Sequence, residues 1–173
     1  MKDFKRLILA EANQISILHN AIHESYLNRN QDHAKWKNAC ETFHSYKSEI
    51  DPYIDRVHQE TEFIDRELQE FVIVFLELDP MFFRSGYIKE VMLKKIKRAP
   101  LTGKQLQRLR EIVLNAINSR PFREFKAYCR LASTIADTKL QSSVEKIATH
   151  GEGARKSRAK LVLDHINQKP LMN

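Results

Sequence analysis

The sequence predicts an all-α protein that forms a single domain over residues 1–173, with seven to eight helices. Three observations favour this fold class. Apolar residues recur along most of the chain with the 3.6-residue period of an amphipathic helix. Only four of the 173 residues are glycine, well below the usual ~7% and too few for a turn-rich β protein. Proline and glycine also fall at intervals that divide the chain into segments of helix length.

The chain begins with two predicted helices, at residues 3–27 and 31–50. The polar sequence Asn-Arg-Asn at 28–30 separates them, as is typical of a loop. The apolar stripe of the first helix consists of Phe4, Ile8, Ile15, Leu18, Ile22 and Tyr26. The stripe of the second consists of Trp36, Ala39, Cys40, Phe43 and Ile50. We expect both stripes to face the core.

A third helical segment begins at Asp51 and Pro52 and extends to Leu78, as one long helix or as two that break near Thr61. Asp51 is expected to be the N-cap and Pro52 the first helical residue, since the missing N–H of proline costs nothing there. Residues 71–76 are all apolar and could also form a buried strand. Because the apolar residues before them continue at helical spacing, we predict a helix. A helix that is apolar all round belongs at the centre of the fold.

The second half divides into five predicted helices connected by short joints. Their expected ranges are 86–98, 103–118, 121–136, 138–149 and 153–167. Thr102 with Gln105 predicts a capping box, and Asp137 is a natural N-cap. Asp79, followed by proline, predicts a further helix start. The last six residues are expected to fray.

Short helices joined by two to four residues, from Gly103 onward, predict consecutive antiparallel hairpins. This stretch resembles stacked helix pairs of the HEAT type, whose units are ~40 residues long. The resemblance implies HEAT-like hairpins packed against an N-terminal helical bundle. The expected inward positions are Leu106, Leu109, Val113, Phe122, Phe125, Cys129, Leu140, Val144, Ile147, Ala159, Val162 and Ile166.

A broader resemblance covers the chain from Trp36 to its end. Three segments carry it: WKNACETFH at 36–44, RSGYIKE at 84–90 and YCRLA at 128–132. They are similar to a family of uncharacterised helical bacterial proteins. The resemblance implies a helical fold and an intracellular bacterial origin, and it implies no activity.

Charge is divided unevenly along the chain. Residues 1–83 contain 9 Lys/Arg and 15 Asp/Glu, a net charge of −6, whereas residues 84–173 contain 20 and 7, a net charge of +13. We expect the helix at 86–98 to bury Ile88, Val91, Met92 and Ile96 and to direct its cations outward. The candidate binding surface consists of Lys89, Lys94, Lys97, Arg98, Lys104 and Arg108.

Two interpretations of this surface remain open. The basic half could pack against the acidic half, with its other charges solvated. Alternatively, the surface binds an anionic partner, and we predict an acidic protein, so that the chain is a non-enzymatic protein-interaction module. Nucleic acid is the alternative partner. The nearby aromatics mostly occupy inward helical positions, which disfavours stacking on single strands. They are Phe82, Phe83, Tyr87, Phe122, Phe125 and Tyr128.

One pattern bears on catalysis. Arg158 and His165 match in spacing the Arg…His pair of helical ribonucleases of the HEPN type. The resemblance implies RNA cleavage by these two residues on one helix face. The polar residue that usually follows the arginine in that family is replaced by Ala159. A HEPN-like ribonuclease is therefore the catalytic form of the nucleic-acid alternative.

Metal chemistry is not expected, and neither is a cofactor. His19 and His23 have a suitable spacing, but the glutamate of a HExxH motif is absent. Glu41 with His44 is an ExxH pair of the kind used by helical di-iron proteins, with an approximate second copy at 55–58. Because Glu41 falls away from the inward face, such ligands cannot converge.

The remaining expectations concern Arg110 and the location of the protein. Arg110 lies within the apolar stripe of its helix, so we expect a carboxylate or carbonyl partner other than Glu111. Cys40 and Cys129 are far apart and lack CxxC spacing, which favours a reducing compartment. No apolar run reaches the ~18 residues of a membrane span, and the first ten residues do not resemble a signal peptide. We expect a cytoplasmic protein without membrane association.

Overall fold

The computed structural model describes residues 2–119 and 123–168, and this part of the chain contains nine helices and no strand. The all-α prediction is confirmed. The helices are α1 (Phe4–Leu27), α2 (His33–Ser45), α3 (Asp51–Gln59), α4 (Arg66–Leu78), α5 (Ser85–Ile96), α6 (Gly103–Asn118), α7 (Phe125–Ile135), α8 (Thr138–His150) and α9 (Gly153–Asn167). The expected count of seven to eight is too low. The expectations for Pro121, Phe122 and the last five residues lie outside the described residues.

The segment at 51–78 forms two helices, which is the second of the two alternatives. Asp65 ends the intervening loop as the N-cap of α4, and its side chain accepts hydrogen bonds from the backbone N–H groups of Glu67 and Leu68. Arg56 Nη2 lies 2.5 Å from Asp65 Oδ2, which ties α3 to the start of α4. The break therefore has a local cause, because a cap satisfies helical N–H groups that have no intrahelical partner.

Several predicted helix ends are confirmed, and two are wrong. Thr102 and Gln105 form a capping box at α6, and the Asp137 side chain accepts from the Leu140 N–H at α8. Asp51 is the first residue of α3 rather than its N-cap, which is Ile50. Asp79 ends α4 in the left-handed conformation, with φ 43°, instead of starting a helix. The proline that follows Asp79 cannot continue α4, and the next helix begins only at Ser85.

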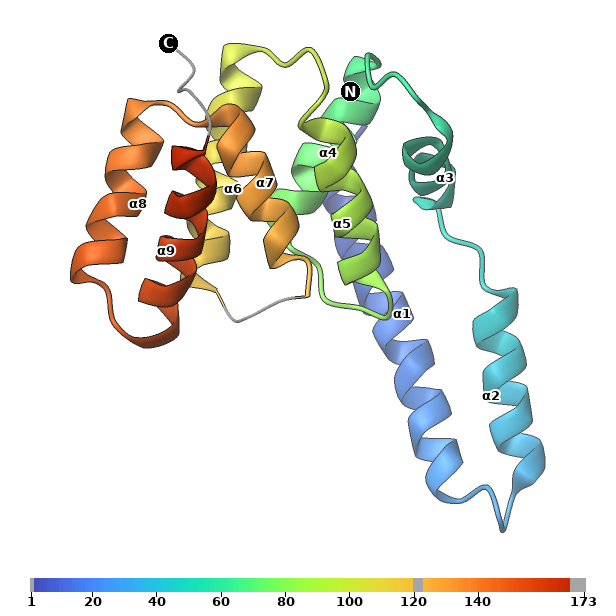
Figure 1. Ribbon diagram of the computed structural model, residues 1–173. Coiled ribbons are helices and arrows are strands. Elements are labelled where there is room, and N and C mark those ends of the chain that lie inside the picture. Colours follow the sequence, from blue (N-terminus) through green and yellow to red (C-terminus); the bar gives the residue numbers. More distant parts are fainter. Residues whose placement is uncertain (1, 120–122, 169–173) are drawn as a thin grey trace.

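Helix α4 lies at the centre of the fold, where it contacts α1, α3, α5 and α6 (Figure 1). Its apolar residues are buried on several sides of the helix, namely Leu68, Phe71, Val72, Ile73, Phe75 and Leu76. The predicted central helix is thus confirmed over the stretch that could have been a strand. Burial of each such side chain stabilises the fold by ~1.5–3 kcal/mol.

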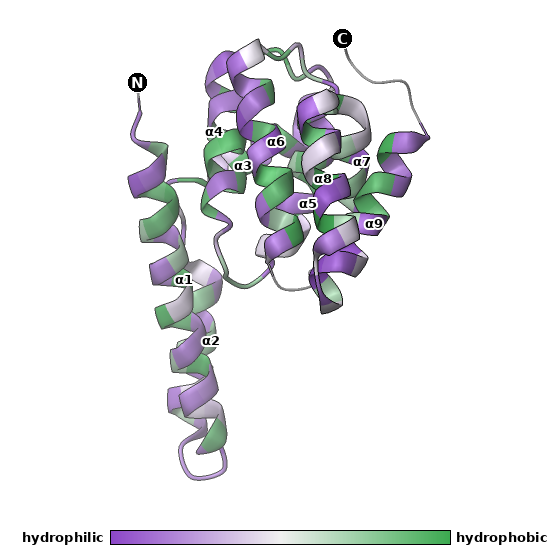
Figure 2. Cartoon of the chain, turned by 90° about the vertical axis from the view of Figure 1, so that its left-hand side faces the viewer, coloured by the Kyte–Doolittle hydropathy of each residue, from purple (hydrophilic) through white to green (hydrophobic). Residues whose placement is uncertain are grey.

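Helices α1 and α2 form a hairpin that extends away from the other helices (Figures 1 and 2). Only the first turns of α1 enter the core, where the ring of Phe4 makes edge contacts with Tyr53 and Phe71. Helix α2 has no buried residue. The apolar stripes predicted for these helices pack mainly against one another, so the expected N-terminal bundle is a projecting hairpin.

The last four helices pack together beside α4 (Figure 1). Helix α6 contacts α4, α7, α8 and α9, while α9 lies against both α7 and α8. The buried residues of this group include Leu109, Val113, Cys129, Val144, Ala159, Val162 and Ile166. Within the described part of the chain, no helix combines the length and the hydropathy needed to cross a membrane.

Candidate functional site

Helix α5 contains two of the six residues of the predicted binding surface, Lys89 and Lys94, and Lys97 and Arg98 follow it directly. It buries Ser85, Lys89, Met92, Leu93 and Ile96. Ile88 and Val91, which were expected in the core, are only half-buried. The helix is therefore turned about its axis relative to the expectation, so that Lys89 faces inward and an apolar edge faces outward.

Lys89 cannot belong to a binding surface, and its prediction as a surface residue is wrong. Its side chain is 1% exposed. Its Nζ lies 2.5 Å from Asp79 Oδ1 and 3.0 Å from Glu124 Oε1, and Glu124 is itself buried. Two carboxylates from the end of α4 and the start of α7 offset the cost of removing the ammonium group from water.

Arg108 is also engaged within the molecule. Its Nε lies 2.6 Å from Glu77 Oε1, and its Nη1 lies 2.7 Å from Glu70 Oε2. The hydrogen bond to Glu77 is the main reason that the pKa of the guanidinium lies above its ordinary value. This network joins α6 to α4, so Arg108 holds the two halves of the chain together and is not free to bind a partner as expected.

Of the other four predicted residues, three are exposed and one is half-buried. Lys94 is exposed, and its Nζ lies 2.9 Å from Glu90 Oε1. Lys97 is half-buried, whereas Arg98 and Lys104 are exposed. The hydrogen bond from Lys94 lowers the pKa of the Glu90 carboxyl below its ordinary value. We call Lys94, Lys97, Arg98 and Lys104 the basic surface.

A groove lies between α3 and α5, beside the basic surface. It has a volume of about 1050 Å³ and is lined by His58, Phe83, Arg84, Tyr87, Ile88, Glu90, Val91 and Lys94. We call it the α3/α5 groove. Two aromatic residues that were expected in the core lie exposed in its lining: Phe83 is 48% exposed and Tyr87 60% exposed. The sequence analysis missed this exposure because it assigned Ile88 and Val91 to the inward face of the helix.

Cations cover the aromatic rings of the groove. The Arg123 guanidinium lies 3.6 Å from the centroid of the Tyr87 ring, and that of Arg84 lies 5.1 Å from the Phe83 centroid. Arg84 has φ 68° at the N-cap of α5. A non-glycine residue in this conformation costs of order 1–3 kcal/mol. The turn is closed by hydrogen bonds between Phe82 and Ser85, which hold Arg84 at the groove despite an unfavourable backbone.

A second hollow, of about 770 Å³, adjoins the groove on the side of the α1–α2 hairpin. The two share Phe83, Arg84 and Ile88 in their linings. The His19 ring stacks on Phe83, with centroids 5.6 Å apart. At the far side the buried Glu11 accepts hydrogen bonds from the hydroxyls of Tyr46 and Ser48. Burial, together with the Glu11 hydrogen bond, raises the pKa of Tyr46 to about 12.

Arg158 and His165, the predicted ribonuclease pair, contact two different backbone carbonyls. Arg158 Nε donates to the Ile117 carbonyl at 2.8 Å, near the end of α6. His165 Nδ1 lies 2.9 Å from the Leu161 carbonyl of its own helix. The carbonyl groups at a helix end carry partial negative charge, so the position of Arg158 is explained by packing of α9 on α6.

The residues considered for metal binding do not converge. Among the described residues, no group of three or more His, Cys, Asp and Glu side chains could hold a metal ion. Glu41 forms an exposed i,i+4 pair with Lys37, and His23 is exposed. Cys129 is buried, which raises the pKa of its thiol to about 11. It is therefore a poor nucleophile near neutral pH.

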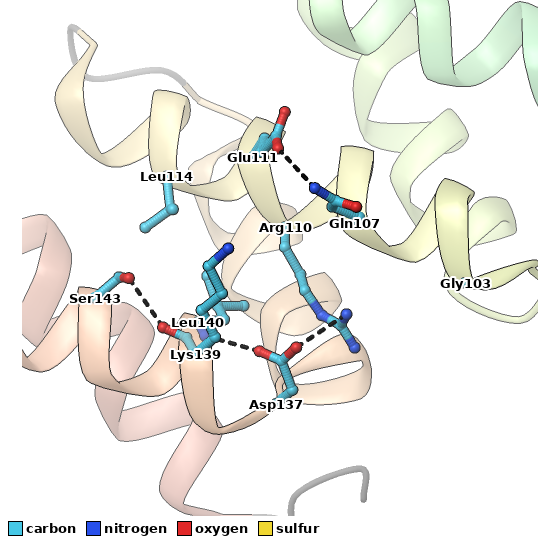
Figure 3. Close-up of a pocket in the computed structure, with 9 residues that line it drawn as sticks. All are labelled: Gly103, Gln107, Arg110, Glu111, Leu114, Asp137, Lys139, Leu140 and Ser143. Carbon is cyan, nitrogen blue, oxygen red and sulfur yellow. Dashed lines mark hydrogen bonds and ion pairs between the residues drawn. The ribbon is translucent and has the colours of Figure 1, made fainter.

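Arg110 has the structural partners that its position in the apolar stripe predicts. Its Nη1 lies 3.0 Å from Asp137 Oδ2, and its Nε donates to the Ile135 carbonyl at 2.8 Å. Figure 3 shows Glu111 turned to Gln107 instead. These residues line a hollow of about 280 Å³. Because Asp137 also caps α8, this arrangement is explained by the packing of α6 on the α7–α8 joint.

Comparison of the chain with protein-family models, with curated proteins and with solved structures found no match in any of the three.

Proposed function

We propose that this chain is a non-enzymatic protein-interaction module that binds an acidic protein through the basic surface of its second half. One observation carries the proposal. The second half has a net charge of +13, and the ion pairs that join it to the first half engage the cations of Lys89 and Arg108. Among the described residues of the second half, Arg98 and Lys104 are exposed.

The exposed cations extend beyond the basic surface. They include Lys126, Arg130, Lys139, Lys146, Arg155 and Lys160 on α7, α8 and α9. A field of one sign raises the rate at which an oppositely charged partner is captured and suppresses association with wrong partners. The charge thus supports an acidic partner.

A protein partner is favoured over nucleic acid by the surroundings of the exposed aromatics. Bases stack on open aromatic faces when a protein binds single strands. Here Arg123 lies over Tyr87, while Arg84 and His19 lie over Phe83. A face of each ring is therefore covered, which disfavours the stacking of bases, although both side chains stay partly exposed. Arg158 and His165 each contact a backbone carbonyl, and these contacts give no support to a ribonuclease.

The packing of the last four helices supports the HEAT-like part of the proposal. Helix α6 contacts α7, and α8 contacts α9, as within two helix pairs. Contacts of α7 with α9 and of α6 with α8 are those expected between stacked pairs. We propose that such an array is the scaffold of a bacterial cytoplasmic protein. The buried free thiol of Cys129 is in keeping with a reducing compartment.

Binding to labelled probes at several salt concentrations tests this function. The probes are an acidic, glutamate-rich polypeptide, a DNA duplex and a single-stranded RNA. We expect the full chain to bind the acidic polypeptide, and Arg98→Glu with Lys104→Glu to weaken that binding about tenfold. The matched control reverses Lys35 and Lys37, exposed cations of α2, and should change nothing. Failure to bind the polypeptide, or preference for nucleic acid with a steep salt dependence, would contradict the proposal.

A further inference from the structure

The α3/α5 groove combines an apolar lining with cations at its edge. Phe83, Tyr87, Ile88 and Val91 supply exposed or half-exposed apolar surface. Arg84 and Lys94 lie in the same lining, and Arg123 reaches it over the Tyr87 ring. We propose that this groove binds an acidic amphipathic helix of a partner protein. The inference rests on the proposed function and names the form of the acidic partner and the place where it binds.

The groove exists because of how α5 is turned. The pairing of Lys89 with Asp79 and Glu124 fixes that residue inward. Ile88 and Val91 then pack against the edge of the core, where they are only half-buried and also line the groove. The fold leaves this apolar edge of α5 half-covered. Amphipathic helices bind to such surfaces through apolar side chains at positions i, i+3, i+4 and i+7.

The length of the groove fits a partner helix. Its lining follows α5 from Arg84 to Lys94. Arg84 and Lys94 are ten residues apart, so they lie about 15 Å from each other along the axis of α5. A partner helix of three to four turns can place apolar side chains between two acidic ends that meet these cations.

The charges that face the groove select an acidic partner. Its lining contains one carboxylate, Glu90, which Lys94 and Arg123 already contact at 2.9 and 3.7 Å. Arg84, whose guanidinium lies over Phe83, adds a further positive charge. The lining of the adjoining hollow contains two carboxylates, those of Glu11 and Asp51. An acidic helix is therefore expected to bind along α5 rather than beneath the α1–α2 hairpin.

The test uses two labelled peptides of the same composition. Each has sixteen residues, rich in Glu and Leu. In one the leucines recur at i, i+3, i+4 and i+7; in the other the order is scrambled so that no apolar face forms. We expect the full chain to bind the patterned peptide about tenfold more tightly. Arg84→Glu with Lys94→Glu should remove most of that preference, and Tyr87→Ala should weaken binding several-fold. All three side chains are exposed, so the variants should fold.

The matched control is Arg155→Glu with Lys160→Glu, which reverses two exposed cations on α9 and should leave the preference intact. Equal binding of both peptides, dependent on Arg98 and Lys104, would overturn the groove proposal and leave the proposed function standing. Binding of neither peptide would overturn both. Concentration-dependent dimerisation that the groove variants abolish would identify a second copy of this chain as the occupant and would also overturn the inference.

Discussion

Lys89 is the residue whose role depends most on its surroundings. Its ammonium group lies between the carboxylates of Asp79 and Glu124, and both Lys89 and Glu124 are almost completely buried. Removing one partner of a buried ion pair leaves the other charge without compensation, which costs more than the pair contributes. Asp79 lies at the end of α4, Glu124 at the start of α7 and Lys89 within α5. They therefore fix the relative positions of three helices.

We predict that Lys89→Ala lowers the free energy of unfolding by about 3–5 kcal/mol, because it leaves the buried Glu124 carboxylate unpaired. Urea denaturation at neutral pH measures the change. Lys94→Ala is the matched control on the same helix; its exposed pair with Glu90 should account for less than about 1 kcal/mol. Equal effects of the two substitutions would show that burial does not distinguish these lysines.

At the scale of an element, the start of α4 depends on one side chain. Asp65 caps the helix and also receives a hydrogen bond from Arg56, whose Nη2 lies 2.5 Å away. That hydrogen bond is the largest cause of the lowered pKa of the Asp65 carboxyl. A carboxylate with a lowered pKa stabilises the fold above its unfolded pKa, near 4, and this stabilisation is lost as the pH falls through the folded value.

Asp65→Ala should therefore destabilise the protein by about 1–2 kcal/mol at pH 7, and the difference from wild type should shrink below pH 4. Urea denaturation across pH 3–7 measures it. Asp32→Ala removes the corresponding N-cap of α2. Because α2 lies outside the core, that control should change global unfolding much less. A pH-independent effect of Asp65→Ala would contradict the assignment of a charged cap.

The glycine that follows α8 leads to a second prediction about the stability of a helix end. Gly151 follows the helix, and a Cβ at this position would lie 2.4 Å from the Ile147 carbonyl oxygen. Since that atom is backbone, Gly151→Ala should cost about 1–3 kcal/mol. Gly103→Ala, at the start of α6, meets nothing within 4 Å and should be neutral or slightly stabilising. Thermal unfolding of the two variants makes the comparison, and equal melting temperatures would refute it.

The helices and several of their ends could be predicted from the sequence because their causes are local. The period of the apolar residues gives α4, and Thr102 with Gln105 gives the start of α6. The inward face of α5 could not be predicted in this way, since half of its residues are apolar and they lie on more than one side of the helix. Its rotation is decided by Asp79 and Glu124, which come from other elements. The α3/α5 groove follows from that rotation and was missed for the same reason.

At the scale of the whole molecule, the uneven charge has two consequences. Part of it joins the halves, most directly through Arg108, which contacts Glu70 and Glu77 of α4. Other cations of the second half, such as Arg98 and Lys104, are exposed. The sequence gives the amount of charge in each half, but it does not say which cations find carboxylates across the molecule. The first interpretation, packing of the basic half against the acidic half, therefore holds for Lys89 and Arg108. Binding of a partner by the exposed cations stays a prediction.

The shape of the molecule also predicts how its stability is distributed. Helix α4 is surrounded by other helices, whereas α2 touches mainly α1 and has no buried residue (Figure 2). Local opening costs little free energy where few apolar contacts are lost.

We therefore predict that the backbone amides of α2 exchange with solvent deuterium near the rate of an unstructured chain. Those of α4 should exchange only through global unfolding. Hydrogen exchange followed by mass spectrometry measures both in one sample. Helix α9, which lies at the surface yet buries Ala159, Val162 and Ile166, is the internal control and should be protected far more strongly than α2. Protection of α2 that equals that of α9 would mean that the hairpin is covered in solution, and self-association would then have to be measured over the same concentration range.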